Sequence, residues 1–352
     1  MINIAIVAGG DSGEYAISML SGEQVEQQID RKLFQPFLID IRGDSWLYSK
    51  DGSEYPVDKN DFSLHLPGTH IRFDVVFNAI HGTPGENGKL QGYLDMLAIP
   101  YTSSDVITSA LTFNKAFCKS VVAHYGIRTP QSVLLNKRRR ETVSALSDTI
   151  SLPCFIKPNN GGSSVGMTKV TSAGQLPAAI ELAFREDEEV LAEEFIQGRE
   201  LTCGVLRTNG ETVTLPVCEI VSKKEFFDYE AKYTKGMADE IVPAPVSPDV
   251  SNECRQISAN LYDLLNCKGL VRFDYIYSGE KFFFLEVNTV PGLTEASIVP
   301  KMIREHGWSY TELVTKLIEE ALITPKSTSA SPEYSGSQGD LLPPLGGWGS
   351  DQ

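Results

Sequence analysis

Apolar runs separated by segments with helical spacing fill the first part of this 352-residue chain. Three runs have the length and composition of buried strands: residues 2–8, 35–40 and 73–80. Two segments repeat their apolar positions with the spacing of a helix: residues 18–29 and 90–97. Strands that alternate with helices predict an α/β fold whose N-terminal lobe, residues 1–103, has a doubly wound parallel sheet. Ligand-binding residues are expected at the carboxyl ends of its strands.

A smaller central lobe is predicted over residues 104–192. One helix is expected from Ser104 to Tyr125, because Ser and Asp stand at its start and Gly126 follows it. Two strands and a second helix come next: residues 153–158, 169–170 and 175–184. The run from Glu189 to Ile196 is predicted to be a strand that leads into the next lobe.

The third lobe is predicted over residues 193–324. It is expected to contain a strand, a hairpin and a closing helix: residues 200–207, 269–277 with 281–288, and 311–322. From Pro325 the chain is rich in Ser, Gly and Pro and has little apolar content, so residues 325–352 are predicted to be a disordered tail.

The hairpin of the third lobe places polar residues among apolar ones. Side chains alternate along a strand, so Arg272 and Asp274 share one face and Glu286 and Asn288 share another. If the faces coincide, two carboxylates meet, and at about 4 Å they repel by about 4 kcal/mol at an effective dielectric of 20. An all-oxygen set without His or Cys suits a hard cation. A solvated hairpin face with scattered charge is the alternative.

The net charge of the chain indicates which classes of binding partner are not expected. The chain carries 31 basic and 46 acidic residues, which gives −15. So acidic a protein is not expected to bind nucleic acid nonspecifically, although a few placed lysines suffice for a nucleotide. The six cysteines show no CxxC spacing and are expected to be reduced. The N-terminus lacks the features of a signal peptide and no run is long enough to cross a membrane, so a cytoplasmic location is predicted.

A Gly- and Ser-rich loop follows the strand at 153–158. Residues 159–166 contain three glycines and two serines, and successive backbone N–H groups in such a loop can hold phosphate oxygens. A flexible hairpin explains the composition equally well. Lys157 is expected to contact a phosphate because it precedes the loop, whereas Lys115 by itself has the pattern of a surface lysine. Residues 193–196, beside Glu200, have a pattern that would suit a base and a ribose.

Two further segments carry weaker signals. Asn288 to Gly292 forms a Pro-Gly turn that precedes Ser297, and exposed N–H groups there would suit an anion, although a simple turn is an equal alternative. Residues 226–235 mix aromatic and charged side chains in a long connection, which is typical of a closing lid and also of ordinary surface loops.

Together these segments resemble the ATP-grasp superfamily and, within it, the D-alanine–D-alanine ligases. The resemblance covers residues 2–323. The motifs that carry it are Gly9-Gly-Asp-Ser-Gly-Glu14, His81-Gly-Thr-Pro-Gly-Glu-Asn-Gly88, Phe155-Ile-Lys-Pro158, Gly161-Gly-Ser-Ser-Val-Gly166, Asp228-Tyr-Glu-Ala-Lys-Tyr233 and Glu286-Val-Asn-Thr-Val-Pro-Gly292. It implies a three-lobed ATP-grasp fold and a homodimer.

The resemblance also implies how ATP is bound. Lys115, Lys157 and Lys232 would contact the phosphates, with Ser163 and Ser164 in the loop that closes over them. The remaining nucleotide contacts would hold adenine and ribose: Glu193, Glu194, Phe195 and Ile196 for adenine, and Glu200 for ribose. Two Mg²⁺ ions, or Mn²⁺ in their place, would be held by Asp274, Glu286 and Asn288.

For the amino acids, the resemblance implies two subsites. Glu14 would receive the ammonium group of the first D-alanine with His81 nearby, and Ser297 with the Ile298 N–H would take the carboxylate of the second. Arg272 and the Gly292 N–H would stabilise the oxyanion of the tetrahedral intermediate. Tyr233 would close the lid by hydrogen bonding with Ser163 and Glu14, and a tyrosine there favours a D-amino acid over D-lactate.

The implied reaction forms an acyl phosphate from D-alanine and ATP, and the amine of a second D-alanine then displaces the phosphate. Tyr15 and Ala16 depart from the family pattern of a basic residue followed by an acid. Two alternatives stay open: a ligase of other acids within the superfamily, and a nucleotide-binding protein without catalysis. The intact set of lysines, Arg272 and carboxylates argues against the second.

Overall fold

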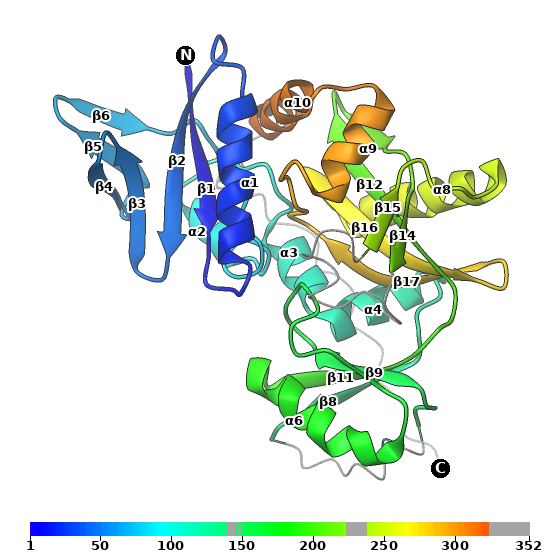
Figure 1. Cartoon of the computed structure of the whole chain (residues 1–352). Coiled ribbons are helices and arrows are strands. Elements are labelled where there is room, and N and C mark those ends of the chain that lie inside the picture. The colour runs from blue at the N-terminus through cyan, green and yellow to red at the C-terminus, as the bar shows by residue number, and fades with distance from the viewer. Residues whose placement is uncertain (139–145, 147–148, 223–237, 324–352) are drawn as a thin grey trace, which may run out of the picture.

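The structure is a computed structural model that describes residues 1–138, 146, 149–222 and 238–323. Its strands form sheets of seven, four and six strands (Figure 1). The predicted lid at 226–235, with Lys232 and Tyr233, and the predicted tail at 325–352 lie outside the described residues. None of the described helices combines the length and apolar character needed to span a membrane.

The first sheet is built around a strand that is buried on both faces. β1 (Ile2–Gly9) pairs in parallel with β2 (Phe34–Arg42) and β7 (Val75–Asn78). The face that carries Ile4 packs against α1 (Tyr15–Gln28) and α10 (Tyr310–Ile323), and the face that carries Ala5 packs against α2 (Lys89–Met96). Helices on both faces explain why every residue from Ile4 to Gly9 is buried.

Four antiparallel strands extend this sheet beyond β2, and the sequence pattern did not predict them. They are β3 (Ser45–Lys50), β4 (Ser53–Asp58), β5 (Ser63–Leu66) and β6 (Thr69–Arg72). They are short and half exposed, so they lack the continuous apolar runs that marked the parallel strands.

The single helix predicted from Ser104 to Tyr125 is wrong, because the chain forms two helices. α3 (Val106–Phe113) ends at Asn114, whose backbone is extended (φ −85°, ψ 101°). The Asn114 side chain accepts a hydrogen bond from Phe117 N at 3.0 Å and so caps α4 (Lys115–His124). Lys115 is therefore the first residue of a helix rather than a mid-helix residue.

The second sheet is antiparallel and has the strand order β10-β9-β11-β8. Its elements are β8 (Ser132–Asn136), β9 (Cys154–Pro158), β10 (Thr168–Val170) and β11 (Glu189–Glu194), with the short helix η1 (Ala173–Gln175) and α6 (Leu176–Glu186). Ala179 and Ala183 of α6 pack with Ile156 and Ala192 of the sheet and form a small separate core.

The third sheet has the order β15-β14-β12-β16-β17, with β13 paired to β12. Its strands are β12 (Arg199–Thr208), β13 (Glu211–Thr214), β14 (Cys218–Ser222), β15 (Ala238–Ile241), β16 (Leu270–Ser278) and β17 (Lys281–Asn288). α8 (Pro248–Leu264) covers one face and α9 (Ile298–His306) the other. The sequence pattern did not predict α8 or α9.

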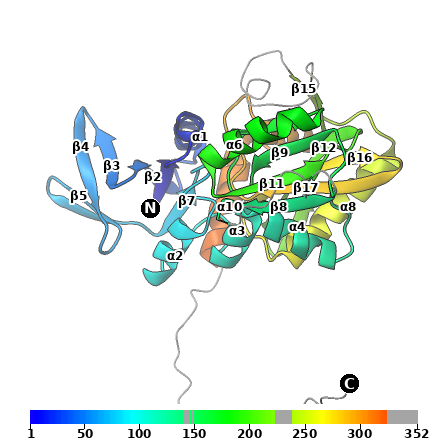
Figure 2. The ribbon, with the colours of Figure 1, turned by 90° about the horizontal axis from the view of Figure 1, so that it is seen from below.

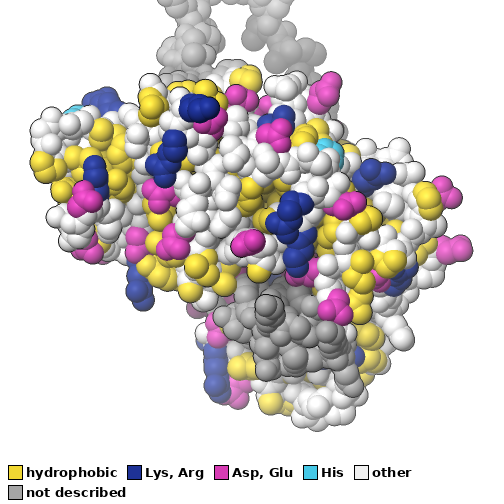
Figure 3. All heavy atoms as spheres, turned by 45° about the horizontal axis from the view of Figure 1, so that its top comes forward, with side chains coloured by type: hydrophobic (Ala, Val, Ile, Leu, Met, Phe, Trp, Pro, Cys, Tyr) yellow, Lys and Arg dark blue, Asp and Glu magenta, His cyan; other side chains and the backbone are white. Residues whose placement is uncertain are grey.

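One hydrophobic cluster joins the first sheet to the third. It runs from Ile4 and Phe77 of the first sheet through Leu317 of α10 to Met302 of α9 and Leu206 of β12. In Figure 2, which is seen from below, the second sheet overlaps the third, and the first sheet lies on the other side of α10. On the face drawn in Figure 3, acidic and basic side chains are interspersed. All six cysteines are free and buried, as the sequence predicts.

Candidate active site

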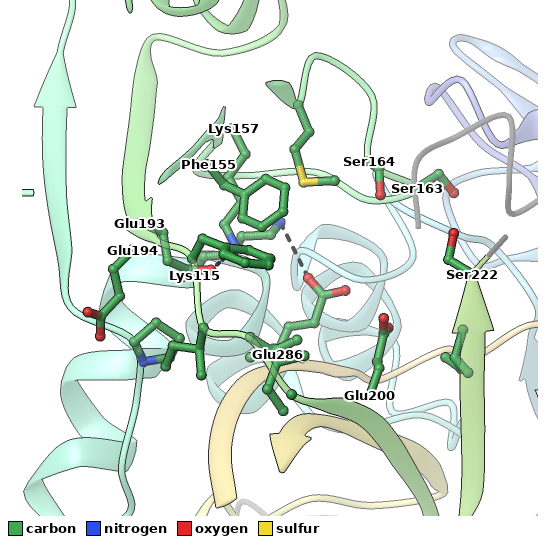
Figure 4. Close-up of a pocket in the computed structure, with 18 of the residues that line it drawn as sticks. Lys115, Phe155, Lys157, Ser163, Ser164, Glu193, Glu194, Glu200, Ser222 and Glu286 are labelled. Carbon is green, nitrogen blue, oxygen red and sulfur yellow. Dashed lines mark hydrogen bonds and ion pairs between the residues drawn. The ribbon is translucent and has the colours of Figure 1, made fainter. Parts of the chain in front are cut away.

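A cavity of about 470 Å³ lies between the second and third sheets (Figure 4). β9 and β11 form one wall, and β12, β14, β16 and β17 contribute to the opposite side. Nine of the residues expected to bind ATP line this cavity: Lys115, Lys157, Ser163, Ser164, Glu193, Glu194, Phe195, Ile196 and Glu200. Glu286 also lines it, so the cavity reaches the carboxylate end of the hairpin.

Two lysines meet at one buried carboxylate beside this cavity. Lys157 Nζ donates to Glu193 Oε1 at 2.8 Å, and Lys119 of α4 forms an ion pair with the other oxygen. Lys119 and Glu193 are each only 3% exposed at the side chain, and burial lowers the pKa of Lys119. Sequence reasoning missed Lys119, which lies one helical turn after Lys115 on the buried face of α4.

The Gly- and Ser-rich loop is attached to the start of α4. Asn159 accepts from Lys115 N through its carbonyl at 3.1 Å and from Ala116 N through its side chain at 2.9 Å. Lys115 Nζ in turn donates to Gly161 O at 2.5 Å. Ser163 and Ser164 have positive φ values of 51° and 58°, an uncommon conformation for residues with a side chain. The loop is thus held in a specific turn above the lysines.

Apolar side chains also line the cavity. The rings of Phe155 and Phe195 lie edge to face, with centroids 5.9 Å apart. Further apolar residues close the cavity: Met167, Ile220, Ile276 and Leu285. Lysines together with aromatic rings give the cavity charged groups for the phosphates and apolar groups for the base of a nucleotide. The alternation of side chains along β9 and β17 is the sequence signal that could have identified Phe155 and Leu285 as residues of the cavity.

The hairpin is antiparallel, as predicted, with a register shift between Asp274 and Tyr275. Asp274 lies directly opposite Glu286, and Arg272 lies opposite Asn288. Asp274 accepts hydrogen bonds from three side chains: Thr202 Oγ1 at 2.6 Å, Arg272 Nε and Nη2 at 2.9 and 2.8 Å, and Asn288 Nδ2 at 3.0 Å. Thr202 comes from β12 and was not predicted. The sequence argument therefore placed the carboxylates correctly.

The compensating charge that the sequence argument required is partly supplied by the protein. Arg272 forms a bidentate ion pair with Asp274, and Lys115 Nζ lies 3.9 Å from Glu286 Oε2. Among the described residues, no group of three or more His, Cys, Asp and Glu side chains could hold a metal ion. The predicted ligand set is of a different kind, because it consists of two carboxylates and one amide: Asp274, Glu286 and Asn288. The oxygen atoms of these groups fit a hard cation such as Mg²⁺.

The expected amino-acid end lies beside the phosphate loop. Ser163 Oγ donates a hydrogen bond to Glu14 Oε1, so the first and second lobes meet at this carboxylate. A Cβ added to Gly162 would lie 2.6 Å from Glu14 Oε2, so the loop passes very close to Glu14. A side chain at position 162 would therefore require the Glu14 carboxylate to move.

The second expected amino-acid subsite lies at the start of α9. Ser297 is its N-cap residue but makes no capping hydrogen bond, because Ser297 Oγ pairs with Thr294 Oγ1 at 2.8 Å. A helix start of this kind leaves the N–H of Ile298 and its neighbours for an anion. Gly292 lies next to it, since a Cβ on Gly292 would be 2.8 Å from Ser297 Oγ.

His81 is buried beside this site. It is 5% exposed, and both ring nitrogens engage protein groups, Val290 O and Ser21 Oγ. Burial lowers the pKa of His81. Burial, followed by the charge of Glu14, raises the pKa of the neighbouring Glu86 to about 7. Sequence reasoning did not single out Glu86 or Ser21.

Family models match most of the chain. A model described as D-ala D-ala ligase N-terminus matches residues 3–104, and one described as D-ala D-ala ligase C-terminus matches residues 121–319. The chain belongs to the D-alanine–D-alanine ligase family. Its fold is the ATP-grasp fold that the resemblance implied.

Individual members of the family are similar over nearly their whole length. The D-alanine–D-alanine ligase of Azobacteroides pseudotrichonymphae is 46% identical over 323 residues, 91% of this chain and 99% of that protein. The one from Phocaeicola vulgatus is 45% identical over 318 residues, 90% of this chain and 98% of that protein.

Solved structures of related ligases are also similar to this chain. The VanG D-Ala:D-Ser ligase from Enterococcus faecalis has a TM-score of 0.82 and 32% identity, with 91% of this chain and 99% of that chain covered. The D-alanyl-alanine synthetase A from Vibrio cholerae also has a TM-score of 0.82, with 27% identity and coverage of 92% and 98%.

The departure from the D-alanine–D-alanine ligase family at Tyr15 has a structural counterpart. Tyr15 OH donates to Asp40 Oδ2 at 2.6 Å, and the Arg42 guanidinium carbon lies 5.0 Å from the centre of the Tyr15 ring. A hydrogen bond and a cation–π contact thus connect the first residue of α1 to β2, directly after Glu14.

Proposed function

We propose that this protein joins two D-alanine molecules into D-alanyl-D-alanine with ATP as co-substrate, for peptidoglycan synthesis. The observation that supports this most strongly is the cavity in which Lys115, Lys157 and the Ser163 loop meet Glu286 of the hairpin, while Ser163 also bonds Glu14. The cavity suits a nucleotide, and the loop connects it to the residue expected to bind the first amino acid. Family membership and relatives with this name give the same reaction.

ATP would occupy the cavity with adenine between Phe155 and the backbone of Glu194 to Ile196. Glu200 would bind the ribose, and Lys115 and Lys157 would bind the phosphates. The N–H groups around Ser163 and Ser164 would close over the transferring phosphoryl group. Lys232 and Tyr233 would complete the enclosure from the lid, as the resemblance implies.

The amino acids would bind on the other side of the hairpin. Glu14 would hold the ammonium group of the first D-alanine, and Ser297 and Ile298 would hold the carboxylate of the second. A carboxylate oxygen of the first D-alanine attacks the γ-phosphorus and ADP leaves. The second amine then attacks the acyl carbon, loses a proton and expels phosphate. Arg272 and the Gly292 N–H would stabilise the oxyanion between these events.

Asp274, Glu286 and Asn288 would hold two Mg²⁺ ions, with Mn²⁺ as an alternative. When bound, the ions would neutralise negative charge on the phosphates. Arg272 bonds both oxygens of Asp274, so it orients this carboxylate as well as facing the reaction centre. Because ATP is supplied in the cytoplasm, that is the proposed location, and a homodimer is the proposed assembly.

A second candidate is ligation of D-alanine to D-serine. It is favoured by the match to the VanG D-Ala:D-Ser ligase, whose 32% identity exceeds the 27% of the Vibrio cholerae synthetase. The two candidates share the first half-reaction and differ only in the amine that enters beside Ser297.

An oxygen-transfer experiment tests the proposal. D-alanine labelled with ¹⁸O in its carboxylate is incubated with ATP, Mg²⁺ and the protein, and the phosphate and peptide are analysed by mass spectrometry. We expect one ¹⁸O atom in each phosphate released together with dipeptide. Phosphate without label would contradict an acyl phosphate. Parallel reactions with D-serine or D-lactate added separate the two candidates.

A further inference from the structure

The backbone of Val290 is bonded at both its N–H and its carbonyl by one loop of the first lobe. Val290 N donates to Glu86 Oε1 at 3.1 Å, and Val290 O accepts from His81 Nδ1 at 2.8 Å. The two side chains stand five positions apart after β7, while Val290 follows β17 more than 200 residues later. A pair of bonds fixes the position of this peptide segment and also its rotation.

A third bond from the first lobe lies on the other side of Gly292. Leu293 N donates to Ser21 Oγ at 3.3 Å, and Ser21 Oγ lies 3.1 Å from His81 Nε2. Ser21 belongs to α1, and Ser21, His81 and Leu293 are buried. The Pro291-Gly292 peptide is therefore held between two anchored residues.

The hydrogen-bond directions form one consistent set. A carbonyl only accepts, so His81 Nδ1 carries the proton that it donates to Val290 O. In a neutral imidazole, Nε2 then accepts from the Ser21 hydroxyl, whose oxygen remains free to accept from Leu293 N. Burial of His81 favours this neutral form. Protonation of Nε2 would leave two donors facing each other unless the hydroxyl turned away.

Glu86 completes the connection through its second oxygen. Oε2 accepts from Gly82 N at 2.7 Å, while Oε1 accepts from Val290 N. The carboxylate thus bridges the residue after His81 to the segment that contains the oxyanion donor. Two acceptor oxygens are needed, and the ionised form of Glu86 supplies them without a competing donor.

We propose that His81, Glu86 and Ser21 are positioning residues that hold the Gly292 N–H in place for the acyl-transfer step. The inference rests on the proposed function, because Gly292 is assigned to the oxyanion there. It changes the part expected of His81, from a neighbour of the substrate ammonium group to a support of the oxyanion site. It also ties that site to the lobe that carries Glu14.

The ratio of phosphate to dipeptide tests this role. In Glu86→Gln, one of the two N–H groups faces an amide NH₂ instead of an acceptor, so the 290–293 segment is less well placed. The acyl phosphate then forms but reacts slowly with the second amine, and part of it is lost to water. We expect phosphate to exceed dipeptide at least about threefold, with the KM for ATP changed by less than about twofold.

A matched control perturbs the same loop without touching Val290. Gln91 Nε2 donates to Gly85 O, and its side chain is 1% exposed. Gln91→Met is expected to lower stability while phosphate and dipeptide stay equal. Ser21→Ala removes the bond to Leu293 N and should raise the ratio as Glu86→Gln does. It also provides the measurement if Glu86→Gln does not fold.

Equal phosphate and dipeptide in both folded Glu86→Gln and Ser21→Ala would overturn the inference. Failure of the proposed function is a separate result, because the wild-type protein would then make no dipeptide from D-alanine and ATP. The same reactions, run with the wild type in parallel, distinguish the two failures.

Discussion

Lys157 and Glu193 are hydrogen bonded across the two central strands of the second sheet, with Lys157 Nζ 2.8 Å from Glu193 Oε1. Lys119 pairs with the other oxygen from α4, so one buried carboxylate is shared by two lysines. Glu193 was expected to contact adenine. Its side chain restrains a lysine expected to bind phosphate, which makes Lys119 a determinant of where Lys157 lies.

Lys119→Met should weaken ATP binding. Without Lys119, Glu193 has only Lys157 to balance its charge, and Lys157 is held more tightly away from the cavity. We expect the KM for ATP to rise about tenfold and the unfolding free energy to fall by about 3 kcal/mol. Steady-state kinetics and chemical denaturation measure both. Lys281→Met, at an exposed strand end, is the control, and an unchanged KM for ATP in Lys119→Met would refute this role.

Gly162→Ala should affect D-alanine more than ATP. The new Cβ would lie 2.6 Å from Glu14 Oε2, and the carboxylate must move to avoid it. We expect the KM for D-alanine to rise about tenfold while the KM for ATP changes by less than about twofold. In Gly174→Ala the Cβ meets nothing within 4 Å, so this variant controls for the loss of a glycine. Equal changes in both KM values would argue against a separate effect on Glu14.

Glu286→Gln should nearly abolish phosphate release while the fold is retained. The substitution removes one of the two proposed carboxylate ligands and leaves the shape of the hairpin unchanged. We expect a loss of at least about 100-fold in kcat, measured over a range of Mg²⁺ concentrations, and a melting curve close to that of the wild type. Glu280→Gln in the exposed turn of the same hairpin should retain activity. Near-normal turnover in Glu286→Gln would show that the metal ligands lie elsewhere.

The cysteines should be unreactive in the native protein. Burial raises the pKa of Cys118, Cys203 and Cys218 to about 12, and it also raises the pKa of Cys154, Cys254 and Cys267. Thiolate is the reactive form, so a thiol-specific reagent such as DTNB at pH 8 should react slowly until denaturant is added, when six thiols should appear. A thiol that reacts rapidly in the folded protein would be inconsistent with this burial.

The parts of the fold that follow local rules could be predicted from the sequence. Alternation along two strands with a short Gly-containing connector predicted the antiparallel hairpin, but the pairing of Asp274 with Glu286 also depends on a register shift between Asp274 and Tyr275 that the sequence did not predict. The central strand β1 was recognised because burial on both faces leaves a continuous apolar run. The phosphate loop and Lys157 were also indicated by local pattern, whereas Lys115 was assigned to ATP only through the family resemblance.

The features that sequence reasoning missed depend on contacts between segments that are distant in the sequence. The break at Asn114 arises where α4 meets Asn159 of the loop, and local spacing alone favoured a continuous helix. Lys119 has the sequence pattern of any helical lysine until β11 places Glu193 against it. The bonds from His81 and Glu86 to Val290 join segments separated by more than 200 residues, which no local pattern reports.

Product stoichiometry tests the central claim most directly. The protein is incubated with ATP, Mg²⁺ and D-alanine alone, and ADP, phosphate and D-alanyl-D-alanine are measured together, with L-alanine as the control. The account predicts equal amounts of all three products with D-alanine and none with L-alanine. ATP turnover that requires a different acid or amine, or that yields no dipeptide with D-alanine, would contradict it.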